Sequence, residues 1–187
     1  MLQNADIELR TARLILRPPS LADLDPWITM MADEEVARYI GGVQPPSMVW
    51  RALMCMAGAW HLAGYAMFSV IERSSGRWVG RLGPWQPYGW PGTEIGWTIV
   101  RDCWGRGYAT EGAIAAADWA FDRLGWKEMI HCIAPDNTAS QAVARKLGSL
   151  NRGPGKLTPP LENLAIDIWG QTREQWRRGA ARASPTP

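Results

Sequence analysis

The sequence lacks the features that mark secreted, membrane-spanning and metal-binding proteins. It has only three cysteines, and Cys55, Cys103 and Cys132 stand far apart, which is typical of reduced thiols in a cytoplasmic protein. It contains no Cys-x-x-Cys or His-x-x-x-His pair that would ligate zinc. The start, MLQNADIELR, has no basic-then-apolar secretory signal, and no run of about 18 apolar residues is present to cross a bilayer. We therefore expect a cytoplasmic protein with no metal site and no membrane partner.

Excess charge of either sign is also missing. The net charge is +2, so no strong field predicts binding to nucleic acid or to a membrane surface. Lysine is scarce, with 3 residues against 17 arginines, and several arginines crowd the C-terminal end, where they indicate a solvated helix face. The length of 187 residues predicts one domain, spanning residues 1–178, followed by a disordered tail at 179–187.

Phenylalanine is rare, with 2 residues, whereas tryptophan is abundant, with 12. Indole rings bury a large apolar area while keeping one hydrogen-bond donor. We expect most of these tryptophans to pack in the core and a minority to line a ligand surface.

Hydrophobic periodicity predicts an α+β fold. Strands are predicted at 7–17, 65–72, 77–87, 93–100, 127–134 and 163–171. Helices are predicted at 20–31, 33–40, 48–63, 107–125, 136–148 and 172–179, and a loop at 150–162. Short turns join the strands between 65 and 100 into an antiparallel meander, and the later strands follow helices. A mixed, mostly antiparallel central sheet with helices on both faces follows from this order.

A glycine loop, CWGRGYAT, lies between the strand at 93–100 and the helix at 107–125. Glycines let the backbone approach an anion closely, and a helix N-terminus offers unpaired N–H donors and partial positive charge. Arg106 adds a charge-assisted contact. The loop is neither a Walker loop nor a dinucleotide fingerprint. Two readings stay open from these residues: a cradle for pyrophosphate, or a plain tight turn.

The segment EIGWTIVRDCWGRGYATEGAIAAADWAF, followed by NTASQAVARKLG, resembles the acetyl-CoA-binding core of the GNAT superfamily of N-acetyltransferases. The opening LRTARLILRPPSLADL is similar to the branch that contains the ribosomal-protein alanine N-acetyltransferases, and the resemblance covers roughly residues 7–178. It implies a GNAT-like fold and acetyl-CoA as the co-substrate. Trp104 departs from the family's usual Gln or Arg at the start of the loop. The cofactor-binding residues that the resemblance implies are Ile99, Val100, Trp104, Gly105, Arg106, Gly107, Tyr108, Ala109, Thr110 and Asn137.

The resemblance also implies direct transfer of the acetyl group from the thioester to a primary amine. Glu94 is the candidate general base, acting on the amine directly or through water, with a polar residue on the strand's solvent face as the alternative. A backbone N–H near Ile99 is expected to stabilise the oxyanion. Many superfamily members use a tyrosine for the leaving thiolate, but Ala144 occupies that position. Ser140 is the substitute, unless it only satisfies the first turn of its helix.

The acceptor side is expected to be framed by residues 20–45 and by the aromatic turn that supplies Trp85, Tyr88 and Trp90. These rings are either pocket walls or packing groups in a rigid turn. His61, His131 and the cysteines are expected to be structural. The acceptor remains open between a protein N-terminus and a small-molecule amine, and a homodimer is plausible. The alternatives to an enzyme are a non-catalytic acyl-CoA sensor and a Trp-rich interaction protein.

Overall fold

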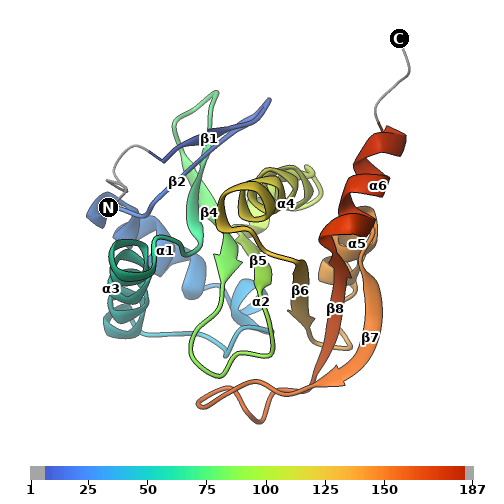
Figure 1. The fold of residues 1–187 in the computed structure, drawn as a ribbon. Helices are drawn as coiled ribbons and strands as arrows, with labels where there is room; N and C mark the ends of the chain where they lie inside the picture. The colour runs from blue at the N-terminus through green and yellow to red at the C-terminus, as the bar shows by residue number, and fades with distance from the viewer. Residues whose placement is uncertain (1–6, 184–187) are drawn as a thin grey trace.

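The computed structural model describes residues 7–183, which form one eight-stranded sheet flanked by helices (Figure 1). The strands follow the spatial order β1-β2-β3-β4-β5-β6-β8-β7, and every pair of neighbours is antiparallel except β5 and β6. The strand bounds are β1 Leu9–Arg10, β2 Leu14–Arg17, β3 Phe68–Glu72, β4 Trp78–Trp85, β5 Glu94–Ile99, β6 Glu128–Ile133, β7 Leu150–Gly155 and β8 Ile166–Thr172. The predicted mixed α+β architecture is confirmed.

Six α-helices are present in this part of the chain. They are α1 Leu24–Met31, α2 Glu34–Ala37, α3 Pro46–Ala63, α4 Tyr108–Trp119, α5 Thr138–Lys146 and α6 Arg173–Ala183. A π-helical turn, Ala120–Leu124, extends α4 to Gly125, which has the left-handed backbone typical of a helix end. Two predicted caps are confirmed. The Asn137 side chain accepts from the Ser140 N–H at 3.0 Å, and Thr172 exchanges backbone and side-chain hydrogen bonds with Gln175.

Alternating side chains of β4 point to opposite helical layers. Leu82 packs against α4 at Gly112, where an added Cβ would lie 2.4 Å from a Leu82 methyl carbon. Arg81 points to the other face, where its guanidinium lies 5.1 Å from the ring centre of Trp27 on α1. The centre of the sheet is therefore covered by a helix on each side, and β4 contributes side chains to both layers.

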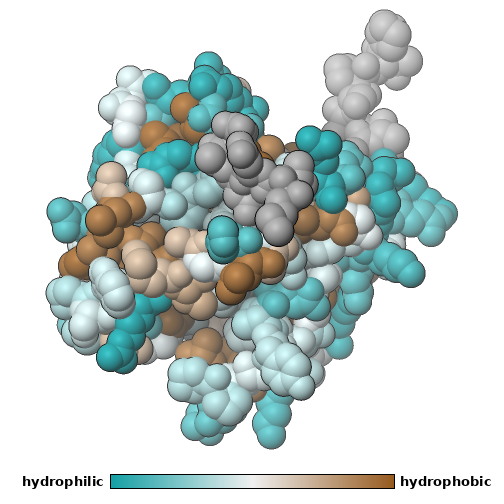
Figure 2. Space-filling model, turned by 60° about the vertical axis from the view of Figure 1, so that its left-hand side comes forward, coloured by the Kyte–Doolittle hydropathy of each residue, from teal (hydrophilic) through white to brown (hydrophobic). Residues whose placement is uncertain are grey.

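Tryptophan serves mainly in packing, as expected. The Trp60 ring on α3 lies 4.9 Å from Phe68 and 5.8 Å from Trp119, and so joins α3, β3 and α4. Trp50 and Trp104, by contrast, are about half exposed, at 48% and 47%. Figure 2, which turns the side carrying α3 forward, shows apolar patches interrupted by polar ones.

Three predicted boundaries are wrong. The expected strand at 7–17 is split into β1 and β2 by a tight turn, in which the Thr11 N–H donates to the Leu14 carbonyl at 3.0 Å. The expected loop at 150–162 contains β7, an edge strand paired with β8. Helix α6 runs to Ala183, so residues 179–183 are helical, while the rest of the predicted tail lies outside the described residues.

Within residues 7–183, no helix is both long and apolar enough to cross a membrane. In the same part of the chain, no three His, Cys, Asp or Glu side chains gather in a way that would hold a metal ion.

Candidate active site

The site is organised by a break in the backbone pairing of β5 and β6. These parallel strands pair at a single position, Glu94 opposite Ile130, in the part of the chain that the structure describes. Beyond that pair, hydrogen bonds that involve side chains join the two strands in place of backbone-to-backbone hydrogen bonds. The His131 ring donates from Nδ1 to the Ile95 carbonyl at 2.6 Å, and the Cys132 N–H donates to a Glu94 carboxylate oxygen at 3.3 Å. The strands are therefore paired through their backbones at one end, and no backbone pairing joins them beyond that point within residues 7–183. We call this unpaired stretch between β5 and β6 the slot.

The backbone of β5 offers hydrogen-bonding groups to this slot. The Val100 N–H donates to the Val79 carbonyl of β4 at 3.0 Å, which fixes the antiparallel alternation. Backbone groups of Trp97 and Ile99 consequently face away from β4, toward β6. An extended ligand arm lying in the slot would pair with them as an added strand does. Of the two positions predicted for this contact, Ile99 is suitably placed, whereas the Val100 N–H is already bonded to β4.

The glycine loop closes the end of the slot at the start of α4. Gly105 and Gly107 both have left-handed backbones, with φ of 75° and 81°, and Gly107 is the N-cap residue of α4. Unpaired N–H groups at such a helix start form a site for an anion. Arg106 is half exposed beside the loop, 3.9 Å from Glu72. Tyr108, Ala109 and Thr110 form the first turn of α4, so the predicted cofactor-binding residues 104–110 are contiguous in space as well as in sequence.

Trp104 has a specific role that its departure from the family pattern did not suggest. Its indole N–H donates to the Ile99 carbonyl at 2.7 Å. The side chain thereby ties the loop to the end of β5. The carbonyl of Ile99 already accepts this bond, so the N–H is the backbone group of this residue that is left for a ligand.

The loop is also held by a clamp that sequence reasoning missed. The Glu111 carboxylate, in the first turn of α4, accepts from the Thr11 hydroxyl at 2.6 Å, from the Arg13 N–H at 2.8 Å and from the Arg13 guanidinium at 2.6 Å. Arg13 in turn donates to the Arg106 carbonyl at 2.8 Å. Burial alone would raise the pKa of Glu111, but the hydrogen bonds from Thr11 and Arg13 outweigh it and lower the pKa.

Replacing Glu111 with alanine is expected to lower the free energy of unfolding by about 2 kcal/mol, because three donors lose a charged acceptor. It is also expected to weaken acetyl-CoA binding, because the loop loses its support. Since the folded-state pKa is lowered, the carboxylate stabilises the fold at neutral pH, and this contribution is lost as pH falls through that pKa. Denaturant unfolding at neutral and acidic pH measures the loss of stability and its pH dependence, and calorimetry measures the loss of acetyl-CoA binding.

Glu174→Ala is the matched control, since Glu174 also lies in a first helical turn and pairs with an arginine, Arg178, but is exposed. We expect that variant to change stability by less than about 0.5 kcal/mol. Equal effects of the two variants would show that the clamp contributes nothing beyond an ordinary surface pair.

Glu94 is buried at the start of β5, with 7% of its surface exposed. The Trp90 indole donates to one carboxylate oxygen at 2.6 Å, and the Cys132 N–H donates to the other. Burial raises the pKa of Glu94, against opposing effects of the two hydrogen bonds and of the Arg81 charge. A carboxylate with a raised pKa is suited to accept a proton near neutral pH.

The three predicted pocket aromatics have different positions. Trp90 contacts Glu94 directly, and Trp85 lies opposite Glu94 in the β4–β5 register, half buried. Tyr88 is fully exposed at 102% and does not join the other two. The structure therefore assembles Trp85, Trp90 and Glu94 on one face of the sheet.

Ser140 approaches the slot from the other face. Its hydroxyl accepts from the Trp97 indole at 3.3 Å, and Trp97 pairs with Leu82, which faces α4. Glu94 pairs with Trp85 three residues earlier on β5, so its side chain points to the opposite face. The two predicted catalytic groups thus flank the slot rather than contact each other. Ala144 is fully buried in α5, and no phenol substitutes for Ser140 there.

The histidines and cysteines outside the predicted site differ in burial: His131, Cys103 and Cys132 are buried or partly buried, whereas His61 and Cys55 are exposed. Burial lowers the pKa of His131 to about 4, and its Nε2 accepts from the Ser149 hydroxyl at 3.0 Å, so the neutral ring with a proton on Nδ1 fits both contacts. His61 is exposed in the last turn of α3. Burial raises the pKa of both Cys103 and Cys132, which disfavours the thiolate.

The acidic residues at the start of α2 have structural contacts as well. Asp33 accepts from the Glu35 N–H at 3.1 Å and pairs with Arg101 at 2.9 Å. Together with Glu34, Thr29 and Ala32 these residues line an open surface depression.

We compared the sequence with known protein families and with known proteins. Residues 13–149 match the family described as an acetyltransferase (GNAT) domain. An uncharacterised N-acetyltransferase from Bacillus licheniformis, p20, is 30% identical over 165 residues, covering 86% of this chain and 92% of that protein.

Solved structures agree with this match. An acetyltransferase from Agrobacterium tumefaciens has a TM-score of 0.76 at 28% identity, covering 88% of this chain and 94% of that one. Two more distant structures share the fold. A ribosomal-protein-S5-alanine acetyltransferase from Vibrio fischeri has a TM-score of 0.70 at 14% identity, covering 91% of this chain and 99% of that one. Mycobacterium smegmatis RimJ in complex with CoA-disulfide has a TM-score of 0.68 at 19% identity, covering 90% of this chain and 88% of that one. The slot, the glycine loop and the matched domain lead to one conclusion: this chain belongs to the GNAT acetyltransferase family.

Proposed function

We propose that the protein transfers the acetyl group of acetyl-CoA to a primary amine, either a protein N-terminus or a small-molecule amine. The observation that carries the proposal is the β5–β6 slot, which has the glycine loop and the N-terminus of α4 at one end and Glu94 and Ser140 on its two faces. Residues 104–110 would hold the pyrophosphate, and the backbone of β5 would pair with the pantetheine arm.

In the proposed reaction, the amine nitrogen attacks the thioester carbonyl while Glu94 accepts its proton, directly or through water. Negative charge on the carbonyl oxygen is stabilised by a slot-facing backbone N–H of β5 near Ile99 that does not pair with the pantetheine arm. The carbon–sulfur bond then breaks, and the thiolate receives a hydrogen bond from Ser140. A hydroxyl is a weak acid, so Ser140 is expected to stabilise the leaving group rather than to donate its proton fully.

The test is release of free CoA thiol across a panel of peptides and small amines, with calorimetry of acetyl-CoA binding alongside. We expect cofactor binding and amine-dependent thiol release. Ser140→Ala is expected to lower kcat by about tenfold, because the transition state loses about one hydrogen bond, and to change cofactor affinity little. Thr138→Ala, two residues earlier on α5, is a matched control, because within residues 7–183 the Trp97 indole donates to Ser140 and not to Thr138.

Two results would reject parts of this proposal. Absence of cofactor binding at millimolar acetyl-CoA would exclude the cofactor assignment. Binding without thiol release on any amine would instead favour an acyl-CoA sensor.

A further inference from the structure

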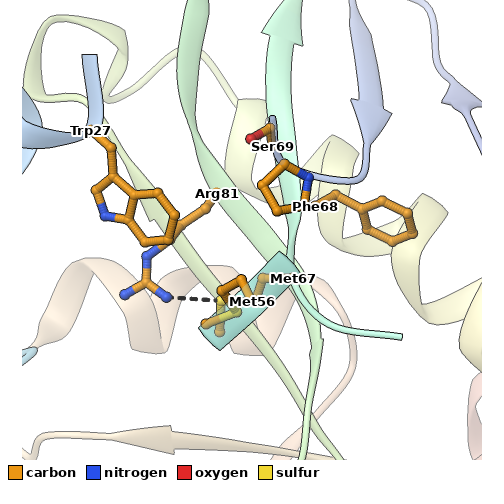
Figure 3. Close-up of a pocket in the computed structure, with 7 residues that line it drawn as sticks. Trp27, Met56, Met67, Phe68, Ser69 and Arg81 are labelled. Carbon is orange, nitrogen blue, oxygen red and sulfur yellow. Dashed lines mark hydrogen bonds between the residues drawn. The ribbon is translucent and has the colours of Figure 1, made fainter. Parts of the chain in front are cut away.

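In the described part of the chain, Arg81 is a cation that forms no ion pair with a carboxylate. One guanidinium nitrogen donates to the Met67 sulfur at 3.2 Å, the charge lies over the Trp27 ring, and the buried Nε has no partner among the described residues (Figure 3). Burial lowers the pKa of Arg81 to about 10, against the attraction of Glu94, which is a sign that the charged form is poorly compensated. A thioether is a weak acceptor, so the guanidinium retains unused donors.

A neighbouring arginine shows how this fold compensates a cation when the role is structural. Arg17 lies in the same cross-strand row as Ser69 and Arg81. It forms two hydrogen bonds with Asp23, at 2.7 and 2.8 Å, and Asp23 also accepts from the Ser69 hydroxyl. The same row therefore holds one arginine with a bidentate carboxylate partner and another, closer to Glu94, without one.

Arg81 and Glu94 point to the same face of the sheet. Arg81 pairs with Thr98 and Trp85 pairs with Glu94, so two-residue alternation places both charges on this side. The intervening pair, Gly83 and Gly96, contributes no side chain.

Met67 fills the space between the two charges. A Cβ on Gly96 would lie 2.6 Å from the Met67 methyl carbon and 3.4 Å from a Glu94 carboxylate oxygen. The Arg81 guanidinium borders a narrow crevice that has no space for a water molecule with Met67 in its present position, lined by Pro19, Trp27, Met56, Met67, Phe68 and Ser69. Methionine is unbranched and adopts alternative rotamers readily. Rotation of Met67 would open a path from the face of Glu94 to the guanidinium.

We propose that Arg81 binds a carboxylate of the acceptor, so that the enzyme acts on amines that also carry a carboxylate. The inference rests on the proposed function: Glu94 receives the amine end, Arg81 the carboxylate end, and Met67 moves aside between them. The planar guanidinium matches a carboxylate with two parallel hydrogen bonds, and a partly desolvated site strengthens the contact. The bound carboxylate would replace the weak thioether acceptor. It would compensate the charge of Arg81 as Asp23 compensates the charge of Arg17.

The test is calorimetric binding of matched amines to the CoA-loaded protein, with each pair consisting of an amino acid and its carboxamide, such as leucine and leucinamide. For the best-binding pair, the carboxylate form is expected to bind about 10- to 100-fold more tightly, as for a hydrogen-bonded ion pair. Arg81→Met is expected to abolish this preference. Arg81→Lys, which keeps the charge but loses the planar fork, is expected to retain part of it.

Arg145→Met is the matched control, because Arg145 also lies 5.1 Å from an indole ring, that of Trp169, but sits on α5. It should leave the preference unchanged. Absence of a preference in the wild-type protein, including absence of binding by either member of every pair, overturns the proposal. So does a preference that survives in Arg81→Met, or, if that variant fails to fold, one that is undiminished in Arg81→Lys.

Failure of this inference is distinguishable from failure of the proposed function. Acetyl-CoA binding and thiol release with carboxylate-free amines report on the transferase activity alone. A protein that acetylates carboxamides and amino acids equally would keep its activity and refute the role of Arg81.

Discussion

Replacing Glu94 with glutamine is expected to lower kcat by about 10²- to 10⁴-fold, the range for loss of a general base. Glutamine has nearly the same shape and retains a carbonyl oxygen that accepts from the Trp90 indole, as Glu94 does at 2.6 Å. It cannot accept a proton from the amine. Steady-state kinetics at saturating acetyl-CoA measure the effect, and cofactor affinity is expected to stay close to that of the wild type.

The pH dependence gives a second readout of Glu94. Because burial raises the pKa of Glu94, the rate is expected to fall on the acidic side of the pH profile, at a pH above that at which ordinary carboxyl groups titrate. The Glu94→Gln variant should lack this acidic limb. A folded-state pKa above the unfolded value means that the protonated form is favoured by folding. Its stabilising contribution is therefore complete at low pH and is lost as pH rises through the folded pKa.

Stability separates loss of catalysis from loss of folding. At neutral pH, Glu94→Gln removes a buried charge, so its melting temperature is expected to equal or exceed that of the wild type. A variant that is stable and binds acetyl-CoA but retains wild-type kcat would refute Glu94 as the base.

Replacing Gly105 with aspartate is expected to weaken acetyl-CoA binding by about 100- to 1,000-fold, as a carboxylate within a few ångströms of a phosphate repels it by several kcal/mol. Gly105 has φ of 75°, and nothing lies within 4 Å of an added Cβ. Aspartate and asparagine tolerate this left-handed backbone better than other residues do. The substitution therefore changes charge more than structure, and calorimetry with acetyl-CoA measures the loss.

Two variants control for backbone strain. Gly105→Asn has the same shape without the charge and is expected to bind acetyl-CoA within about tenfold of the wild type, a difference of about 1.4 kcal/mol. Gly125→Asp introduces the same charge at the opposite end of the α4 segment, where φ is 68° and the surroundings are equally open. If Gly105→Asp and Gly105→Asn weakened binding equally, strain rather than anion binding would explain the effect, and the cradle would be misassigned.

The sequence predicted the parts of the site that are local in the chain. The loop at 104–110 and the Asn137 cap depend on neighbouring residues, so their signals are contiguous. The Glu111 clamp was missed because its partner Arg13 lies 98 residues away. Nothing in either segment alone indicates the contact, and the burial of Arg81 likewise depends on side chains from distant elements.

Strand β7 was missed for a different reason. Its sequence, LNRGPG, has the glycines and proline of a turn. Proline is tolerated there because β7 is an edge strand, and Gly155 is required by close packing, since an added Cβ would lie 2.5 Å from an Ile168 side-chain carbon. Residue propensity was overridden by the position of the segment in the sheet.

His131 gives the slot a property that matters for interpreting kinetics. Its ring spans the gap between β6 and the Ile95 carbonyl, and with a pKa of about 4 it keeps one protonation state throughout the neutral range. The spacer that sets the separation of the strands is therefore indifferent to pH under working conditions. An inflection in the rate at mildly acidic pH would therefore not arise from protonation of the spacer between the strands.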